Sequence, residues 1–261
     1  MATTPAWPFC RAAMATSWHK LESTAVIGLV GGISKFWLKC LNSLRCYNME
    51  TLEQLAEHRP LDTPLVTVSN HHSCLDDPML WGMMKMRILL DNRKIRWTLG
   101  AKELLFSKPF HSFFFSRGKI IPIMRGEGVY QKGMDFAIEE LNRGQWVHVF
   151  PEAGIIEDHS LVRLKWGVGR LIAESSVTPV VLPFWHVGMD DILPNKTPYI
   201  PTIMKRVTVL IGEPMYFDDI LKDFKRRRLN AMETRKNITD CIQERFKELK
   251  EEAEKLHEKW R

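Results

Sequence analysis

The sequence predicts an α/β protein: a single domain with a mostly parallel central sheet flanked by helices. Two observations carry this prediction. Short runs of β-branched and aromatic residues recur along the chain, and segments with apolar residues at helical spacing lie between several of them. Strands that alternate with helices form βαβ units, in which the strands run parallel. A chain of 261 residues with 45% apolar residues holds one substantial core.

We expect three parts along the chain. Residues 1–48 form an N-terminal membrane-associated segment, residues 49–217 an α/β domain, and residues 218–261 a long amphipathic helix packed on that domain. The helix is indicated by apolar residues at spacings of four and three, with charged residues on its other face. These apolar residues are Ile238, Ile242, Phe246, Leu249, Ala253, Leu256 and Trp260.

The N-terminal segment is apolar at its centre and carries interfacial residues at its ends. Residues 23–34 are uncharged, and this run is shorter than the roughly 20 residues of a bilayer-spanning helix. Its three glycines weaken the helix propensity further. Flanking lysines and tryptophans favour a position in the membrane interface over a core helix with snorkelling ends. The residues expected to contact the membrane are Trp18, Val26, Ile27, Leu29, Val30 and Trp37.

The elements of the α/β domain alternate along the chain. Short β-branched and aromatic runs predict strands at residues 65–69, 95–99, 119–124, 146–150, 180–185 and 207–211. Apolar residues at helical spacing predict helices at residues 50–57, 78–86, 129–141 and 166–175.

Two imidazoles, two carboxylates and a hydroxyl lie within residues 70–78, directly after the first expected strand. Polar groups at the exit of a strand lie where α/β enzymes place their chemistry. A histidine paired with an aspartate acts as a general base, because the carboxylate fixes the tautomer and leaves the other ring nitrogen free to take a proton. Two registers fit this pattern: His71 with Asp76, and His72 with Asp77.

The choice between the registers depends on the start of the next helix. Ser73 or Asp77 can cap that helix, with Pro78 at its first position. A capping role for Asp77 favours His71 and Asp76 as the chemical pair. A five-residue offset on a continuous helix turns through about 140°, so the pair meets only if the chain bends between its members.

The motif Asn70-His71-x-Ser73-x-x-Asp76 resembles the first block of the glycerolipid acyltransferase family. Three later segments resemble its other blocks in the same order: residues 118–125, the Phe150-Pro151-Glu152 tripeptide and residues 177–183. The resemblance implies that His71 is a general base oriented by Asp76. It also implies a substrate-binding set, which consists of Asn70, Ser73, Gly118, Arg125, Glu152 and Gly154.

Further segments at residues 128–136, 146–148, 165–167 and 185–189 resemble one branch of that family. This resemblance implies a phospholipid–lysophospholipid transacylase that remodels cardiolipin acyl chains, with phosphatidylcholine as a second substrate and without coenzyme A. It implies a peripheral, monotopic protein of mitochondrial membranes that faces the intermembrane space. No bound cofactor is expected.

One residue departs from the family pattern. The third block has glycine after Phe-Pro-Glu, whereas this chain has Ala153 there and Gly154 next. Glycine at that place permits a positive φ or a close approach of backbone to a phosphate. Ala153 can serve if its φ is negative, or Gly154 can take over by a shift of one residue.

Arg125 and Glu152 follow two of the expected strands. A guanidinium suits bidentate recognition of phosphate, and Arg125 lies near two further basic residues. Glu152 can orient Arg125, bind a substrate hydroxyl, or face a helix N-terminus. His148 and His186 lie among apolar residues and are expected to be structural.

Composition excludes several classes of protein. The net charge of +6 favours an anionic partner such as a membrane surface, and no nucleic-acid-binding motif is present. The five cysteines have no spacing typical of a disulfide framework or a zinc site, and no Gly-x-Ser-x-Gly elbow occurs. We expect neither nucleic acid nor a metal as a partner.

Three alternatives to coenzyme A-independent transfer stay open. The first is a coenzyme A-dependent lysophospholipid acyltransferase. The second is metal-dependent hydrolysis by the His-His and Asp-Asp cluster, which needs further ligands at recognisable spacing that the sequence does not show. The third is a non-enzymatic, membrane-associated scaffold in which the motif only caps a helix.

Overall fold

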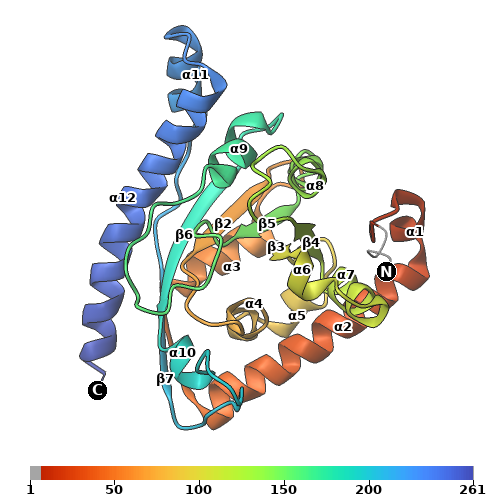
Figure 1. Ribbon diagram of the computed structural model, residues 1–261, viewed down its shortest axis with the longest axis vertical. Helices are drawn as coiled ribbons and strands as arrows, with labels where there is room; N and C mark the ends of the chain where they lie inside the picture. Colours follow the sequence, from red (N-terminus) through yellow and green to blue (C-terminus); the bar gives the residue numbers. More distant parts are fainter. Residues whose placement is uncertain (1–6, 261) are drawn as a thin grey trace.

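The computed structural model describes residues 7–260, which fold around one seven-stranded sheet with helices on both faces (Figure 1). The strand order is β1-β7-β6-β2-β5-β3-β4. The strands are β1 (Ser43–Tyr47), β2 (Leu65–Ser69), β3 (Trp97–Ala101), β4 (Ile120–Ile123), β5 (Trp146–Val149), β6 (Val180–Val187) and β7 (Arg206–Ile211). The α/β fold with a mostly parallel sheet is thus confirmed.

Strand direction brings three strand ends to one edge of the sheet. β2 runs parallel to both of its neighbours, β5 and β6. β3 and β4 continue the parallel part, whereas β7 pairs antiparallel with β6 and parallel with β1. The carboxyl ends of β2, β5 and β6 therefore lie side by side, and the segments that follow them start at the same edge of the sheet, where α/β proteins place ligands.

Two hydrophobic clusters fill the space between the sheet and its two helical layers. One face packs against α8 (Lys132–Leu141), α9 (Gly167–Glu174) and α12 (Ala231–Glu258). The other packs against α2 (Ser17–Phe36), α3 (Met49–His58), α4 (Asp76–Leu80), the 3₁₀ turn η2 (Trp81–Met83) and α5 (Met86–Leu89). Side chains alternate between the faces, so Val66 and Val68 of β2 join the first cluster and Leu65 the second.

The remaining helices are short or peripheral. They are α1 (Arg11–Ala15), the π-helical turn η1 (Trp37–Leu41), α6 (Lys102–Leu105), α7 (Pro109–Arg117), α10 (Met189–Ile192) and α11 (Asp218–Arg226). The C-terminal region is two helices, of which α12 runs along the molecule beside β6 (Figure 1). A capping box starts α12, with the Asn230 side chain accepting from the Glu233 N–H and the Glu233 carboxylate accepting from the Asn230 N–H.

Two of the three glycines of the N-terminal segment, and one glycine of η2, serve packing. α2 is a regular helix of 20 residues. A Cβ built on Gly31 would lie 2.7 Å from the Leu89 side chain, and one on Gly82 would lie 2.6 Å from the Lys35 backbone nitrogen. The helix propensity lost at these positions is offset by close contact with η2 and α5. The helix expected at residues 78–86 is accordingly broken into α4, η2 and α5.

All six expected strands are present, each within two residues of its expected bounds. The strand that the sequence did not indicate is β1, which extends the sheet into residues 43–47 and pairs with β7. It is an edge strand without a fully buried residue, so its sequence lacks an apolar run.

Candidate active site

The imidazole of His71 and the carboxylate of Asp76 form a hydrogen-bonded pair beyond the carboxyl end of β2. Nδ1 of His71 lies 2.9 Å from Oδ2 of Asp76. The chain bends between the two residues, and α4 starts at Asp76. The His71 ring stacks on Phe150, with centroids 4.3 Å apart, and its side chain keeps 21% of its surface exposed. The carboxylate thereby assigns the proton to Nδ1 and leaves Nε2 as the nitrogen available to a substrate.

Asp76 is completely buried, yet it is held as a carboxylate. Its Oδ2 atom also accepts hydrogen bonds from the backbone N–H groups of His72 and Ser73, at 2.8 and 2.9 Å. Burial by itself raises the pKa of Asp76, but the imidazoles of His186 and His71 outweigh it and hold that pKa below its usual value. The site therefore has a fixed negative charge beneath the exposed imidazole.

His186 is the site residue that the sequence analysis placed in the structural core. It is fully buried at the end of β6, where Nε2 donates to the Asn70 carbonyl at 2.9 Å and lies 3.5 Å from Oδ2 of Asp76. Burial lowers the pKa of His186, but the neighbouring Asp76 carboxylate reverses this and leaves it raised. His186 is thus a second imidazole beside Oδ2 of Asp76 and supports the charge of that carboxylate. Its place in the Trp185-His186-Val187 segment was the available signal.

The second register is excluded by what surrounds its members. The His72 side chain is buried, with 2% of the residue exposed, and so cannot meet a substrate. Asp77 accepts from Arg96 at 2.7 Å and from Thr98 Oγ1 at 2.7 Å, which anchors the motif to β3. The expected capping by Asp77 is wrong, since the helix begins at Asp76 without a side-chain cap.

Glu152, just beyond β5, contacts the motif directly. Its Oε2 atom accepts from the backbone N–H of His71 at 2.8 Å. Burial raises the pKa of Glu152 to about 7, against the opposing effect of that hydrogen bond. The expected contact with Arg125 is not formed in the described structure, because Arg125 pairs with Glu103 at 2.5 Å. Glu152 thus holds the backbone at His71 in place.

Asn70 and Ser73 are positioning residues, which corrects their assignment to the substrate. Both are fully buried. The Asn70 amide bonds the backbone N–H and carbonyl of His186, each at 2.9 Å, and so joins the ends of β2 and β6. Ser73 Oγ donates to the Leu193 carbonyl. Asn195 holds the same loop by donating to the His72 carbonyl at 2.7 Å, a role that nothing in its local sequence indicated.

Gly118 and Arg125 flank β4 and lie at opposite edges of the sheet. Gly118 ends α7 before β4 begins, on the edge away from His71, so its expected role in the site is wrong. Arg125 follows β4 and shares the edge of His71, three strands away. Three spacings of about 4.8 Å place it roughly 14 Å from β2, within the reach of a phospholipid. Its side chain is 46% exposed.

The departure at Ala153 keeps the backbone shape that glycine favours. Ala153 has φ +61°, in the left-handed region. The expected negative φ is therefore wrong, and so is the expected shift, because Gly154 is not among the positive-φ residues. A Cβ at Gly154 would contact nothing within 4 Å, so this glycine is not required there for space either.

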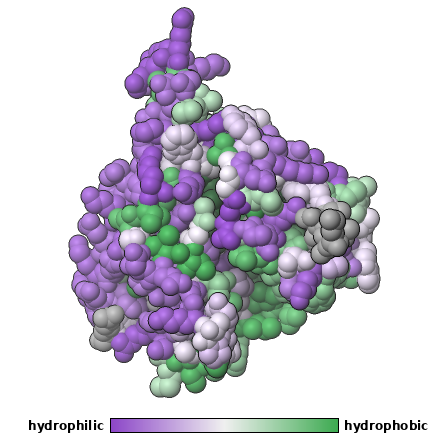
Figure 2. Space-filling view, viewed as in Figure 1, coloured by the Kyte–Doolittle hydropathy of each residue, from purple (hydrophilic) through white to green (hydrophobic). Residues whose placement is uncertain are grey.

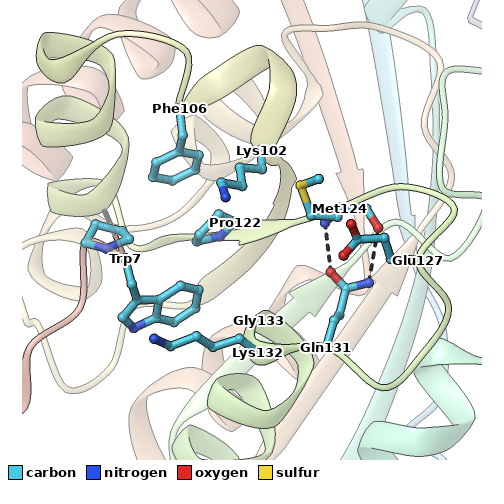
Figure 3. A pocket seen from close by; sticks show the side chains of 10 residues that line it. Trp7, Lys102, Phe106, Pro122, Met124, Glu127, Gln131, Lys132 and Gly133 are labelled. Atoms are coloured by element: carbon cyan, nitrogen blue, oxygen red, sulfur yellow. Dashed lines mark hydrogen bonds between the residues drawn. The ribbon is translucent and has the colours of Figure 1, made fainter. Parts of the chain in front are cut away.

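A separate hollow lies beside β4 (Figure 3). Lys102 and Lys132 reach it from two sides, and Gln131 forms two hydrogen bonds with the Met124 backbone at its rim. No residue of the motif at 70–78 lines it. The hollow adjoins the segment that carries Arg125 and is distinct from the site around His71.

α2 has one face against the domain and one face in solvent. Ile27 is buried, with 6% exposed, so its expected contact with a membrane is wrong. Val26, Val30 and Trp37 are partly buried. The outer stripe, which we define as Trp18, Leu21, Leu29, Ile33 and Phe36, is exposed. Apolar surface gathers where α2 and α7 lie (Figure 2).

Within residues 7–260, residues 17–41 form the one helical stretch that is long and apolar enough to cross a membrane. Of its most apolar part, 22% is buried in the protein.

Among the described residues, one group of side chains has the donors and spacing of a metal site: His72, His159 and Asp190. The His-His and Asp-Asp cluster of the metal-hydrolysis alternative does not form among these residues, because Asp76 faces His71 and Asp77 faces Arg96. His71, Asp76 and Asp77 therefore contact other side chains and do not share an ion.

The comparisons with known proteins agree with this geometry. A family model described as Acyltransferase matches residues 43–187, which include His71, Asp76, Glu152 and His186. The chain belongs to the acyltransferase family. It is 47% identical to a tafazzin from Drosophila melanogaster over 96% of this chain and 66% of the relative, and so spans about two thirds of that relative's length.

Two other relatives cover more of their own length. A "Taffazin" from Dictyostelium discoideum is 40% identical over 77% of this chain and 72% of its own. An N-acylphosphatidylethanolamine synthase from Arabidopsis thaliana is 42% identical over 76% of this chain and 72% of its own. The family thus includes relatives named for different products.

A solved structure shares the fold. The 1-acyl-sn-glycerophosphate acyltransferase PlsC from Thermotoga maritima superposes with a TM-score of 0.59, at 21% identity, over 92% of this chain and 86% of that one. At this identity the likeness supports the fold alone.

Proposed function

We propose that the chain is a phospholipid–lysophospholipid transacylase that remodels cardiolipin without coenzyme A. The observation that carries the chemistry is the 2.9 Å contact between His71 and the buried Asp76, with the other edge of the imidazole free. A buried carboxylate beneath an exposed imidazole is the arrangement of a general base. The choice of substrates rests on the resemblance to tafazzins.

The proposed reaction is one acyl transfer coupled to two proton transfers, one to His71 and one back from it. Nε2 of His71 takes the proton of a lysophospholipid hydroxyl, and the alkoxide oxygen attacks the ester carbonyl of a donor phospholipid. Asp76 stabilises the imidazolium. As the acyl C–O bond of the donor breaks, the imidazolium gives its proton to the departing ester oxygen, which becomes the hydroxyl of the new lysophospholipid. The products are a new phospholipid and a new lysophospholipid, so the reverse reaction uses the same groups.

We place this reaction at a membrane surface reached by monotopic attachment. The outer stripe of α2 contacts the apolar part of one leaflet, while its inner face stays on the domain. Phe110 and Phe113 of α7, which packs beside α2, are exposed and extend this surface. The resemblance favours mitochondrial membranes, with the chain facing the intermembrane space.

The test of the proposal varies the acyl donor and the acceptor. Purified protein is incubated in vesicles with radiolabelled phosphatidylcholine and lysocardiolipin, with and without added acyl-coenzyme A. Transfer from phosphatidylcholine alone supports the proposal. Transfer that occurs only from acyl-coenzyme A would favour the coenzyme A-dependent enzyme, and no transfer from either donor would favour a scaffold.

A second acceptor class has support from one relative. The Arabidopsis relative is named as a synthase of N-acylphosphatidylethanolamine, whose acceptor is an amine. The same base can remove a proton from that amine. Two parallel assays separate a hydroxyl acceptor from an amine acceptor: one offers only lysocardiolipin and the other only phosphatidylethanolamine. Faster formation of the N-acylated product than of the acylated lysocardiolipin would overturn the choice of a hydroxyl acceptor.

A further inference from the structure

Three side chains from separate segments come together next to His71 in the structure. His72 belongs to the motif after β2, His159 to the loop at residues 150–166 after β5, and Asp190 to α10 after β6. Nε2 of His159 lies 2.9 Å from Oδ2 of Asp190. The His72 and His159 rings are stacked, with centroids 4.3 Å apart and planes 10° from parallel. One potential ligand atom from each residue lies within 4.8 Å of the others.

A second observation points to a missing partner at the same place. The other carboxylate oxygen of Asp190, Oδ1, is buried and has no hydrogen-bond partner. A buried carboxylate oxygen without a partner is costly and marks the place of a water or an ion. The described contacts of this carboxylate include one histidine and no arginine or lysine.

We infer that His72, His159 and Asp190 bind a zinc ion that ties the three segments together. Two imidazole nitrogens and one carboxylate oxygen are ligands that zinc accepts, and they leave a fourth position for water. Bonds of about 2 Å in tetrahedral geometry require ligand atoms roughly 3.3 Å apart. The largest separation must therefore shorten by about 1.5 Å or less. The His159 ring must also turn out of its stack on His72, because imidazole lone pairs lie in the ring plane and two parallel rings cannot both point at one ion. The His159 side chain is 37% exposed in an outer loop and has room for this movement.

The site is separate from the acyl-transfer chemistry. His71 directs Nδ1 to Asp76, and neither residue supplies a zinc ligand. The ion instead supports the loop at residues 150–166, which already contacts the motif where the Ile156 N–H donates to the His71 carbonyl at 2.8 Å. Its expected effect is to stabilise the arrangement around His71.

Zinc binding to the full chain is measured by calorimetry and by the unfolding temperature, after removal of metal with a chelator. We expect one equivalent of zinc to bind and to raise the unfolding temperature through preferential binding to the folded state. His159→Ala should weaken binding by at least about 10-fold, and Asp190→Asn should do the same. His58→Ala is the matched control, because His58 is exposed and outside the group, and it should bind zinc as the wild type does.

Cobalt in place of zinc distinguishes this site from the five cysteines. Ligand-field bands without a thiolate charge-transfer band support the proposal. A strong thiolate band, binding unaffected by His159→Ala, or no binding by the wild type would each overturn it. His72→Gln gives a further variant of similar size at the buried position, and retained stoichiometric zinc affinity in that variant would also contradict the assignment.

Discussion

Nδ1 of His71 and Oδ2 of Asp76 lie 2.9 Å apart, across a bend that a continuous helix would not allow. The bend is fixed by the backbone, because the N–H groups of His72 and Ser73 donate to the same carboxylate oxygen. One buried oxygen therefore both shapes the loop and orients the His71 imidazole. This explains why the spacing between the histidine and the aspartate matters as much as their identity.

Substitution of Arg125 tests phosphate recognition beyond the carboxyl end of β4, three strands away from β2. Arg125→Lys keeps the charge but loses the planar fork, so KM for the lysophospholipid should rise roughly 3–10-fold with a smaller effect on kcat. Arg143→Lys is the matched control, since Arg143 is exposed before β5, on the opposite edge. An unchanged KM in Arg125→Lys would remove the guanidinium from substrate binding.

Glu152 makes stability depend on pH. Its pKa is raised by burial to about 7, so between its unfolded value near 4.5 and pH 7 the folded state binds more protons than the unfolded state. Its contribution to stability is therefore present at low pH and is lost as pH rises through 7. Glu152→Gln removes this loss.

The free energy of unfolding of Glu152→Gln, relative to wild type, should increase from pH 4.5 to pH 7.5, at up to about 1.4 kcal/mol per pH unit. Denaturant titrations at a series of pH values measure it. A difference that stays constant over this range would show that the Glu152 carboxyl has an ordinary pKa.

Ala153 holds a left-handed conformation at a cost to stability. A non-glycine residue with φ near +60° destabilises the folded protein by about 1–2 kcal/mol. Glycine removes this cost, but it raises the conformational entropy of the unfolded chain, which offsets part of the gain. Ala153→Gly should therefore stabilise the protein by about 0.5–1 kcal/mol, measured by denaturant unfolding. Gly154→Ala is the comparison, because Gly154 lacks a positive φ and has space for a Cβ. Destabilisation by Ala153→Gly would contradict the assigned backbone.

The outer stripe of α2 should determine membrane attachment. Leu29→Glu and Ile33→Glu should each reduce partitioning into anionic vesicles about 10-fold or more, because each places a charge where apolar surface is buried. Leu61→Glu changes a leucine outside the stripe that is more exposed than Leu29 or Ile33, and it should have little effect.

Two controls test the monotopic geometry. High salt should weaken binding only in part, since the apolar contact is not screened. Both termini should be cleaved by protease on the same side of sealed vesicles. Protection of one terminus alone would show a spanning helix, and complete release by salt would show that the stripe does not enter the lipid.

The sequence predicted the elements whose signal is local. β2 and the motif at residues 70–78 were recognisable because a buried strand gives an apolar run and the chemistry follows it directly. β1 was missed because an edge strand alternates exposed and half-buried residues. The bounds of the helix at residues 78–86 were wrong because Gly82 serves a contact with α2 that no local pattern shows.

Long-range contacts explain the errors in the site. Asn70 bonds His186 across 116 positions of sequence, and Glu152 bonds His71 across 81. Their positions in the sequence indicated that Asn70 and Glu152 lie near His71. Only the arrangement of β2, β5 and β6 in space shows that their side chains form hydrogen bonds with the protein itself and not with a substrate. Gly118 was misplaced because its motif spans β4, whose two ends lie at opposite edges of the sheet.

The most direct test of the central claim is acyl exchange from radiolabelled phosphatidylcholine to lysocardiolipin without coenzyme A, measured for wild type, His71→Ala, Asp76→Asn and His72→Ala. We expect transfer by the wild type, a loss of about 10²–10⁴-fold in His71→Ala and Asp76→Asn, and substantial activity in folded His72→Ala. Circular dichroism confirms that each variant is folded. Wild-type rates in folded His71→Ala, or equal losses in His71→Ala and His72→Ala, would contradict a mechanism based on the His71–Asp76 pair.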